Sequence, residues 1–424
     1  MLYALTIFLG AFLLFQVQPL IGKFILPWFG GGPGVWTTCM LFFQVLLLGG
    51  YAYAHFSTHR LKPRGRTILH AVLLLAALAL LPITPGDAWK PDPDTNPTLR
   101  ILLLLTACLG LPYLVLSTTG PLVQQWFAQA YPDKSPYRLY ALSNLGSLLA
   151  LLSYPFFFET HFTRRAQAAW WGWGLVAYVI CCGLCMWQSK VQSPSSKVQS
   201  PKSEVQSPKS EARSPKSEVS NAGLGAQTSG SDGHPASDPL THSPAHSLTD
   251  SLLWLALPAC ASVLLLATTN KLCQDVAVVP FLWVLPLALY LLSFIICFDN
   301  PRWYAPLPYG LALIAALGGV AWALCKGVDL ALWKQIAAYS GGLFVCCMVC
   351  HGELYRLRPD PSRLTSFYLM IAAGGALGGF FVAVLAPLLL SDYYELHYGL
   401  LLCGLLFILV RVQSPGCKVQ SPKS

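Results

Sequence analysis

Residues 189–220 read SKVQSPSSKVQSPKSEVQSPKSEARSPKSEVS, and this polar repeat divides the chain into two apolar blocks. A Ser-Pro pair recurs every seven residues, after Gln192, Gln199, Gln206 and Arg213. A period of seven is typical of a coiled coil, but a proline in every repeat prevents the helix. The whole insert, residues 188–250, cannot bury enough apolar surface to offset the entropy of ordering. It is therefore predicted to be a disordered, low-complexity linker.

The same Val-Gln-Ser-Pro unit returns in the C-terminal tail at Gln413 and Gln420. A unit copied into two tolerant places indicates a repetitive element and not a binding motif. The predicted organisation is therefore a first membrane half, the linker, a second membrane half and a disordered tail, with these bounds: 1–187, 188–250, 251–410 and 411–424.

The composition is typical of a membrane protein. The chain of 424 residues is 55% hydrophobic and 11% charged, with a mean hydropathy of +0.55, whereas soluble proteins carry about 25% charged residues. The apolar runs approach the roughly 20 residues that a helix needs to cross the hydrocarbon core of a bilayer. We expect an all-α, polytopic transmembrane bundle in a lipid bilayer. The net charge of +9 is assigned to cytoplasmic loops and not to nucleic-acid binding.

About twelve membrane crossings are expected, six in each half. In the first half they are Leu2–Ile21, Val35–Tyr53, Ile68–Ile83, Leu99–Leu116, Tyr140–Phe158 and Ala168–Trp187. In the second half they are Leu252–Thr269, Val276–Cys297, Tyr309–Leu324, Ile336–Cys350, Phe367–Leu390 and Tyr398–Val410. A short amphipathic piece, Gln124–Ala130, is expected to follow the fourth crossing. The first crossing has no basic segment before it, which indicates a retained helix and not a signal peptide.

The distribution of basic residues predicts the orientation. Most of the 27 lysines and arginines fall in the loop 55–67, the linker, the tail and other segments on one side of the predicted bundle. Cytoplasmic loops of membrane proteins are enriched in these residues. We therefore expect a multi-pass protein of the inner (plasma) membrane with both termini and the linker in the cytoplasm.

An internal echo relates the two halves. Tyr140, Gly146 and Leu149 in the fifth predicted crossing recur at the same spacing as Tyr368, Gly374 and Leu377 in the eleventh. The chain thus has six predicted crossings, a linker and six more crossings, with a matching fifth element in each half. This is the plan of a two-repeat transporter. The alternative is chance, because glycine and leucine are common in membrane helices.

Polar residues at matching points of the two halves are candidates for a solute site. Polar groups inside a bilayer are unfavourable and often functional, and interrupted helices in corresponding positions point to a transport cavity. The first half offers Gln16, Gln18 and Lys23 around Pro19, and the second half offers Asn270, Lys271, Gln274 and Asp275. The alternative interpretation is that Lys23 and Lys271 reach the outer interface while the amides cap helix ends.

Two further groups carry titratable side chains. His351 and Glu353 lie at the end of the tenth predicted crossing, beside Arg356 and Arg358. This group is interpreted either as a gate or ion-pair cluster, or as an ordinary basic loop. Glu159 at the end of the fifth crossing, with His161, is a candidate for a proton-titrating pair.

The 14 cysteines lie mainly within apolar runs, which is typical of small buried side chains and not of disulfides. A CCxxC spacing occurs twice, at 181–185 and at 346–350, and the second continues to His351 as a CxxCH pattern typical of haem attachment. That pattern falls on the predicted cytoplasmic side, where such attachment is not normal. We therefore expect no metal, no cofactor and no catalytic residues.

Several motifs together resemble a known family, the membrane domain of fused major-facilitator/spermidine-synthase proteins. The motifs occur in order through both halves, at Gln18–Lys23, Pro27–Trp28, Gly32–Thr38, Ser117–Pro121, Tyr140–Ser147, Asn270–Asp275 and Cys350–Leu354. The resemblance implies a major-facilitator-like fold, adds Asn144 to the candidate residues and suggests a polyamine as the solute. The family also implies a soluble aminopropyltransferase domain, but only 14 residues follow Val410, so synthase activity is not expected of this chain.

Two functions are therefore predicted. The first is a transporter that moves a polyamine or another small solute by alternating access. Lys23 and Lys271 argue against a cationic solute if they line its path. The second is a non-transporting membrane anchor or regulatory partner of a separately encoded, spermidine synthase-like aminopropyltransferase. A further enzymatic activity within the membrane is the least favoured alternative.

Overall fold

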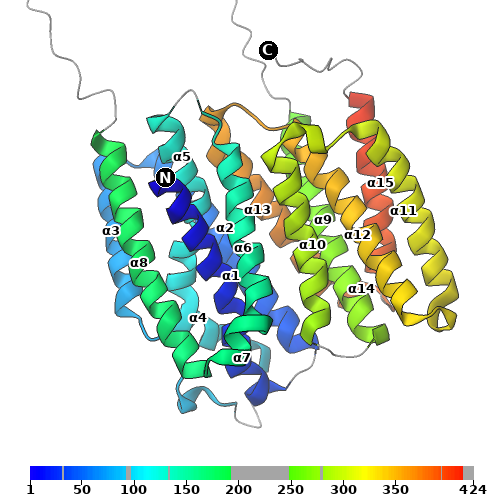
Figure 1. The fold of residues 1–424 in the computed structure, drawn as a ribbon, viewed down its shortest axis with the longest axis horizontal. Helices are drawn as coiled ribbons and strands as arrows, with labels where there is room; N and C mark the ends of the chain where they lie inside the picture. Colours follow the sequence, from blue (N-terminus) through cyan, green and yellow to red (C-terminus); the bar gives the residue numbers. More distant parts are fainter. Residues whose placement is uncertain are drawn as a thin grey trace, which may run out of the picture. The chain divides into compact units, whose positions relative to one another are not determined.

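Helices make up the regular structure of the described chain (Figure 1). The computed structural model describes residues 1–30, 33–91, 97–131, 134–191, 248–276, 280–392 and 394–413. The predicted disorder of the linker and tail concerns residues that lie almost entirely outside these ranges. The predicted boundaries of the linker shift by a few residues, because α8 continues to Val191 and α9 begins at Leu248.

The described residues of the first half form helices that correspond to its six predicted crossings. They are α1 (Leu2–Phe29), α2 (Pro33–Arg60), α3 (Pro63–Ala79), α4 (Pro97–Ser117) continued by α5 (Thr119–Ala130), α6 (Tyr137–Ser153) continued by α7 (Glu159–His161), and α8 (Arg164–Val191). The second half repeats the plan with α9 (Leu248–Val276), α10 (Pro280–Asp299), α11 (Pro306–Lys326), α12 (Leu332–Arg356), α13 (Leu364–Phe380) continued by α14 (Ala386–Leu389), and α15 (Glu395–Gln413).

Ten spans in the described residues are long and apolar enough to cross a membrane. The remaining two crossings of the twelve-helix plan are α3, which is 17 residues long, and α10, whose apolar span is described from Val284 to Asp299. The predicted all-α, polytopic bundle is confirmed.

One predicted element was placed wrongly, and a second is longer than predicted. The third crossing begins at Pro63 and not at Ile68, because proline suits the first position of a helix. It ends before Pro82, which cannot extend it. The short piece expected at Gln124–Ala130 is part of a separate helix, α5, which begins earlier, at Thr119, and prolongs the apolar span of α4 to Ala130. Buried residues of α5 such as Trp126 belong to the core of the first half.

The fifth and eleventh crossings confirm the internal echo in their backbone. The helices α6 and α13 each run for 17 residues and then pass into a five-residue π-helical segment, Tyr154–Phe158 and Phe381–Leu385. Such segments are rare and often occur at functional places. The echo-related Tyr140 and Tyr368 stack on each other with ring centroids 4.9 Å apart. The repeat therefore places equivalent residues face to face where the halves meet.

Glycines allow the repeated helices to pack closely. A Cβ atom on Gly146 of α6 would lie 2.8 Å from the Phe8 carbonyl oxygen of α1. A Cβ atom on Gly374 of α13 would overlap the Leu255 carbonyl oxygen of α9. Small residues permit such backbone approach in membrane bundles, so the pairs α1–α6 and α9–α13 are equivalent interfaces of the two halves.

Both halves begin and end at the same side of the bundle, which we call the terminal face (Figure 1). The halves touch each other there. The Tyr137 hydroxyl donates to the Pro359 carbonyl, Arg138 pairs with Asp299 at 3.4 Å, and the Gln124 side chain accepts from the hydroxyl of Tyr368 at 2.7 Å. These contacts join the two halves at the terminal face.

Candidate functional site

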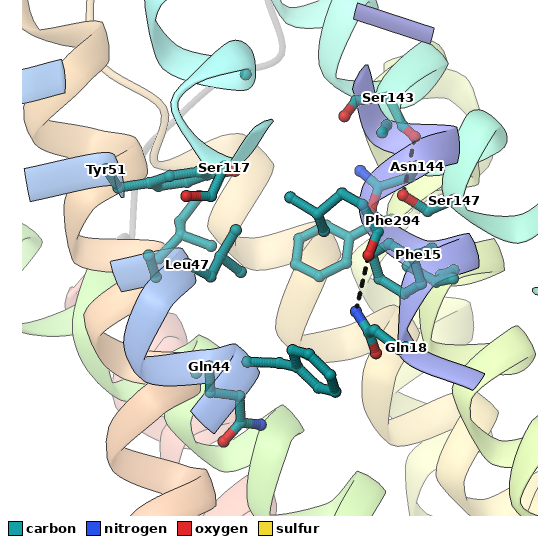
Figure 2. A pocket seen from close by; sticks show the side chains of 18 of the residues that line it. Phe15, Gln18, Gln44, Leu47, Tyr51, Ser117, Ser143, Asn144, Ser147 and Phe294 are labelled. Carbon is teal, nitrogen blue, oxygen red and sulfur yellow. Dashed lines mark hydrogen bonds between the residues drawn. The ribbon is translucent and has the colours of Figure 1, made fainter. Parts of the chain in front are cut away.

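A cavity of about 170 Å³ lies between the two halves, within the bundle (Figure 2). We call it the central cavity. Its lining comes from α1, α2, the α4–α5 bend and α6 of the first half, and from α9, α10 and α13 of the second. Because both halves contribute walls, a movement of one half against the other would change access to this space.

Aromatic and uncharged polar side chains line the central cavity. The aromatic ones are Phe15, Phe43, Tyr51, Tyr113, Tyr140, Tyr290 and Phe294. The hydrogen-bonding ones are Gln18, Gln44, Ser117, Thr119, Ser143, Asn144, Ser147 and Ser262. Among the described lining residues there is no Asp, Glu, Lys, Arg or His. The cavity thus offers ring faces and neutral donors and acceptors.

Hydrogen bonds within the walls fix part of this lining. The Gln18 amide donates to the Tyr113 hydroxyl at 3.2 Å, which links α1 to α4. The Asn144 amide donates to the Tyr140 carbonyl at 2.9 Å, one turn earlier in α6. The side-chain oxygen of Gln44 is buried with no hydrogen-bond partner. An unpaired buried oxygen is unfavourable by about 1–3 kcal/mol, and the Gln44 oxygen packs against Gly379 of α13, a residue outside the described cavity lining.

The predicted glutamine and asparagine candidates separate into two groups. Gln18 and Asn144 line the central cavity. Gln16 is as buried as Gln18, both 7% exposed, but does not belong to the lining. Asn270 lies instead in a separate hollow beside Asp392 and Glu395.

The other candidates near the end of α9 do not belong to the central cavity. Lys271 is half-buried and is not among the described residues of that lining. The backbone at Gln274 and Asp275 continues α9, but their side chains lie outside the described part of the chain. Lys23 and Lys271 were predicted at matching points of one solute path. Neither lysine is among the described residues that line the central cavity.

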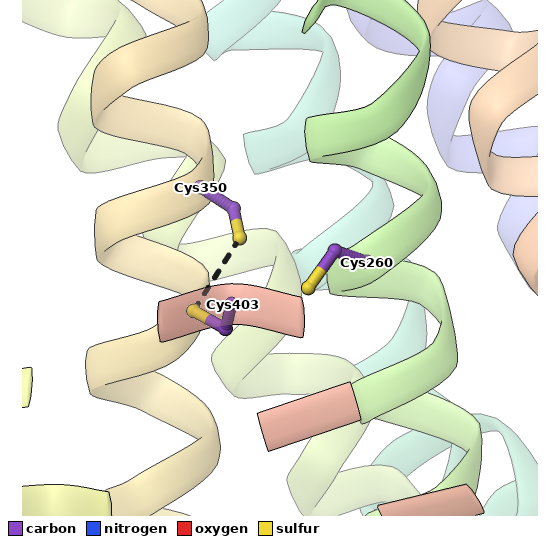
Figure 3. A group of neighbouring side chains, drawn as sticks. All are labelled: Cys260, Cys350 and Cys403. Atoms are coloured by element: carbon purple, nitrogen blue, oxygen red, sulfur yellow. Dashed lines mark hydrogen bonds between the residues drawn. The ribbon is translucent and has the colours of Figure 1, made fainter. Parts of the chain in front are cut away.

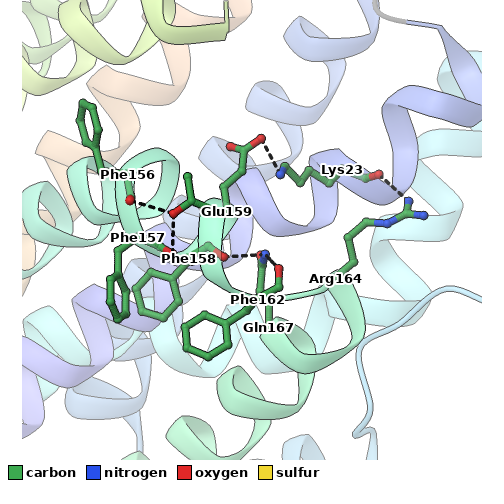
Figure 4. A network of polar contacts seen from close by, with 9 residues as sticks. Lys23, Phe156, Phe157, Phe158, Glu159, Phe162, Arg164 and Gln167 are labelled. Atoms are coloured by element: carbon green, nitrogen blue, oxygen red, sulfur yellow. Dashed lines mark hydrogen bonds and ion pairs between the residues drawn. The ribbon is translucent and has the colours of Figure 1, made fainter.

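Lys23 and Glu159 form an ion pair at the face opposite the terminal face (Figure 4). The Lys23 ammonium lies 2.6 Å from the Glu159 carboxylate, and their side chains are 29% and 45% exposed. The Arg164 guanidinium donates to the Lys23 carbonyl at 3.1 Å. The expected Glu159–His161 pair is not observed: the His161 ring contacts the Phe157 carbonyl and the Thr160 hydroxyl. The Lys23–Glu159 ion pair links α1 to α7, at the end of the fifth crossing.

Glu353 is fully buried at the terminal face and accepts three hydrogen bonds. Its donors are the Tyr304 hydroxyl at 2.8 Å, the Arg356 guanidinium at 2.9 Å and the Arg411 guanidinium. We call these four residues the Glu353 cluster. Burial and the adjacent carboxylate raise the pKa of the Tyr304 phenol, so this hydroxyl remains a neutral donor. The cluster ties α12 to α15 and to the loop before α11, which favours the ion-pair interpretation over an ordinary basic loop.

His351 lies in different surroundings from Glu353. Its ring stacks on Phe294 with centroids 3.5 Å apart, and its Nδ1 contacts the Ser293 hydroxyl at 2.8 Å. Phe294 itself lines the central cavity. His351 therefore supports the cavity wall from behind and does not form part of the Glu353 cluster.

The sequence interpretation missed most of the cavity lining. Tyr140, Ser143 and Ser147 form a polar stripe at helical spacing along α6, which could have been recognised. The lining from α2 and α10 gave no comparable signal, because single tyrosines and glutamines in apolar helices also occur at interfaces. Only the packing of the halves shows that these residues share one space.

Comparison with solved structures shows a shared fold. One match is the proton:xylose symporter XylE of the major facilitator superfamily bound to 6-bromo-6-deoxy-D-glucose, with a TM-score of 0.54, 10% identity and coverage of 97% of this chain and 94% of that chain. Another is the inward-open xylose transporter XylE from E. coli, with a TM-score of 0.51, 12% identity and coverage of 99% and 97%. No sequence family matches the chain. No curated protein matches its sequence. The chain is a multi-pass helical membrane protein with the major-facilitator fold.

Proposed function

We propose that this protein is a secondary transporter that carries a small, uncharged, polar solute through the central cavity by alternating access. The lining of that cavity carries the proposal: two facing halves surround it with ring faces and neutral hydrogen-bonding groups. Sites of this kind suit small solutes that bring hydroxyl or amide groups and apolar faces. The fold shared with a xylose transporter is consistent with this solute class.

The charge balance of the cavity argues for a neutral solute. A polyamine, the solute implied by the family resemblance, would bring two or more positive charges into the space. Burying a charge without a partner is strongly unfavourable, and the described lining offers aromatic faces but no carboxylate. Cation–π contacts contribute roughly 0.5–2 kcal/mol each, which does not offset the loss of hydration of several charges.

Alternating access would require the contacts at the terminal face to separate. The side chains of the Arg138–Asp299 pair are 74% and 46% exposed, so the pair contributes at most about 1 kcal/mol. The basic-residue distribution predicts that the terminal face lies on the cytoplasmic side. On that orientation the described contacts hold the cytoplasmic side closed, and transport would alternate this state with one opened there.

Transport is tested by counterflow in proteoliposomes with labelled xylose, glucose, putrescine and spermidine. We expect exchange of xylose or glucose and of neither amine. Gln18→Met keeps the volume but removes the amide, so apparent affinity falls about fivefold to tenfold, as expected for about 1 kcal/mol of lost hydrogen bonding. Gln16→Met is the matched control, because Gln16 is equally buried in the same helix but does not line the cavity.

Other results would overturn the proposal. Exchange of putrescine or spermidine alone would restore the polyamine assignment. Equal effects of the two glutamine variants would remove the central cavity from the mechanism. No exchange of any solute by folded, inserted protein, together with a co-purifying aminopropyltransferase, would favour the membrane anchor.

A further inference from the structure

Three cysteine thiols from distant parts of the sequence converge in the core of the second half (Figure 3). They belong to Cys260 on α9, Cys350 on α12 and Cys403 on α15, and we call them the cysteine triangle. Their sulfur atoms all lie within 4.8 Å of one another, and those of Cys350 and Cys403 are 3.9 Å apart. None of the three is more than 1% exposed.

The sulfur spacing fits a metal ion at the centre of the triangle. With a metal–sulfur bond of about 2.3 Å, three sulfurs placed around one ion in a plane are separated by about 4.0 Å. The Cys350–Cys403 separation of 3.9 Å already has this length. The other two separations, at most 4.8 Å, need a contraction of less than about 1 Å, which side-chain rotation can supply.

We propose that the cysteine triangle binds a soft, monovalent ion, Cu(I), as a structural site. Thiolate ligands select Cu(I), zinc and iron–sulfur centres, whereas structural zinc is almost always held by four ligands. In the described part of the chain three sulfurs lie within 4.8 Å of one another, and the thiol of Cys346, which contacts Cys403, lies outside this group. A three-coordinate soft ion matches this donor set better than a tetrahedral one.

Binding of the ion releases protons. Cysteine ligates a metal as the thiolate, so each ligating thiol gives its proton to the solvent. The thiols now make only weak contacts, such as Cys260 to the Gly399 carbonyl at 3.6 Å, so little is lost on binding.

The site would act on the second half and not on the solute. None of the three cysteines lines the central cavity. The ion would instead join α9, α12 and α15, three helices of one half, and would stabilise the folded state because the unfolded chain does not hold the three sulfurs together. The CCxxC motif at 346–350 contributes only Cys350 to this group, which explains why motif spacing did not reveal it.

Anaerobic loading of the purified full chain with buffered Cu(I) tests the proposal. We expect about one copper per chain, three sulfur neighbours in X-ray absorption at about 2.3 Å, and a raised Tm. Cys403→Ser and Cys260→Ser lower Cu(I) affinity at least about tenfold. Cys39→Ser is the control, because Cys39 is equally buried on α2 but lies outside the triangle.

Four outcomes would overturn it. They are no copper above background in folded wild-type protein, copper content unchanged in both triangle variants, zinc bound in preference with four ligands, and a Cys350–Cys403 disulfide seen as the loss of two hydrogens in the intact mass. If both triangle variants fail to fold, the copper content and absorption spectrum of the wild type decide alone.

Discussion

Replacing Glu353 by glutamine should destabilise the second half strongly, although the side chain keeps its size. The carboxylate is 0% exposed and accepts from Tyr304, Arg356 and Arg411. An amide offers one acceptor oxygen in place of two and turns an NH₂ group toward the donors. Two guanidinium groups are then left without their counter-charge.

The geometry sets the magnitude of the effect. Breaking a buried ion pair from one side typically destabilises by about 3–5 kcal/mol. The Arg356 and Arg411 side chains are 32% and 35% exposed, so water can hydrate part of the released charge. We therefore expect the lower end, about 3 kcal/mol. Glu159→Gln is the matched control, because Glu159 pairs with Lys23 at 2.6 Å but is 45% exposed and should lose about 1 kcal/mol or less.

Equilibrium unfolding in mixed detergent micelles, followed by tryptophan fluorescence, would measure both variants. The double variant Glu353→Gln with Arg411→Met should recover part of the loss, because one uncompensated charge is removed with the carboxylate. Equal losses for Glu353→Gln and Glu159→Gln would refute the reasoning. So would a loss below about 1 kcal/mol for Glu353→Gln, which would mean that water reaches the cluster freely.

Two further predictions concern the seams of the bundle. Gly146→Ala should destabilise the protein by about 1–3 kcal/mol, because the new Cβ atom would lie 2.8 Å from the Phe8 carbonyl oxygen. Gly375→Ala is the control: a Cβ atom there has nothing within 4 Å, so the unfolding midpoint should change little. Equal midpoints for the two variants would contradict the close packing of α1 and α6. In the double variant Arg138→Cys with Asp299→Cys, a short reducible cross-linker should stop solute exchange, and reduction should restore it. The parent chain treated with the same reagent is the control. Unchanged exchange in the cross-linked variant would show that the terminal face does not open during transport.

The sequence was sufficient for the architecture because a bilayer imposes simple requirements. Helices must be long and apolar to cross it and must satisfy their own backbone hydrogen bonds, so the crossings could be read from the apolar runs. The repeat of Tyr140 and Gly146 as Tyr368 and Gly374 also predicted the equivalence of the fifth and eleventh crossings. The error at Pro63 concerns a helix end, where a few residues decide whether a span continues or stops.

The site could be predicted only in part. Gln18 was recognised because an amide inside a membrane helix is unusual, and Asn144 was recognised from the family resemblance; both line the central cavity. Lys23 and Glu159 were recognised because charged side chains close to a membrane helix are unusual. They form an ion pair with each other at the face opposite the terminal face. Polarity in a sequence shows that a residue has a partner but not whether that partner is a solute, a second side chain or the solvent.

What the sequence determined by itself was local: the apolar length of each crossing, the polar linker between the halves and the repeated small residues. What only the tertiary structure decided was which side chains meet. The central cavity, the three donors around Glu353 and the thiols of Cys260, Cys350 and Cys403 each draw on helices far apart along the chain. Helical periodicity fixes the direction of a side chain from its own axis, but the rotation and tilt of each helix come from packing against its neighbours.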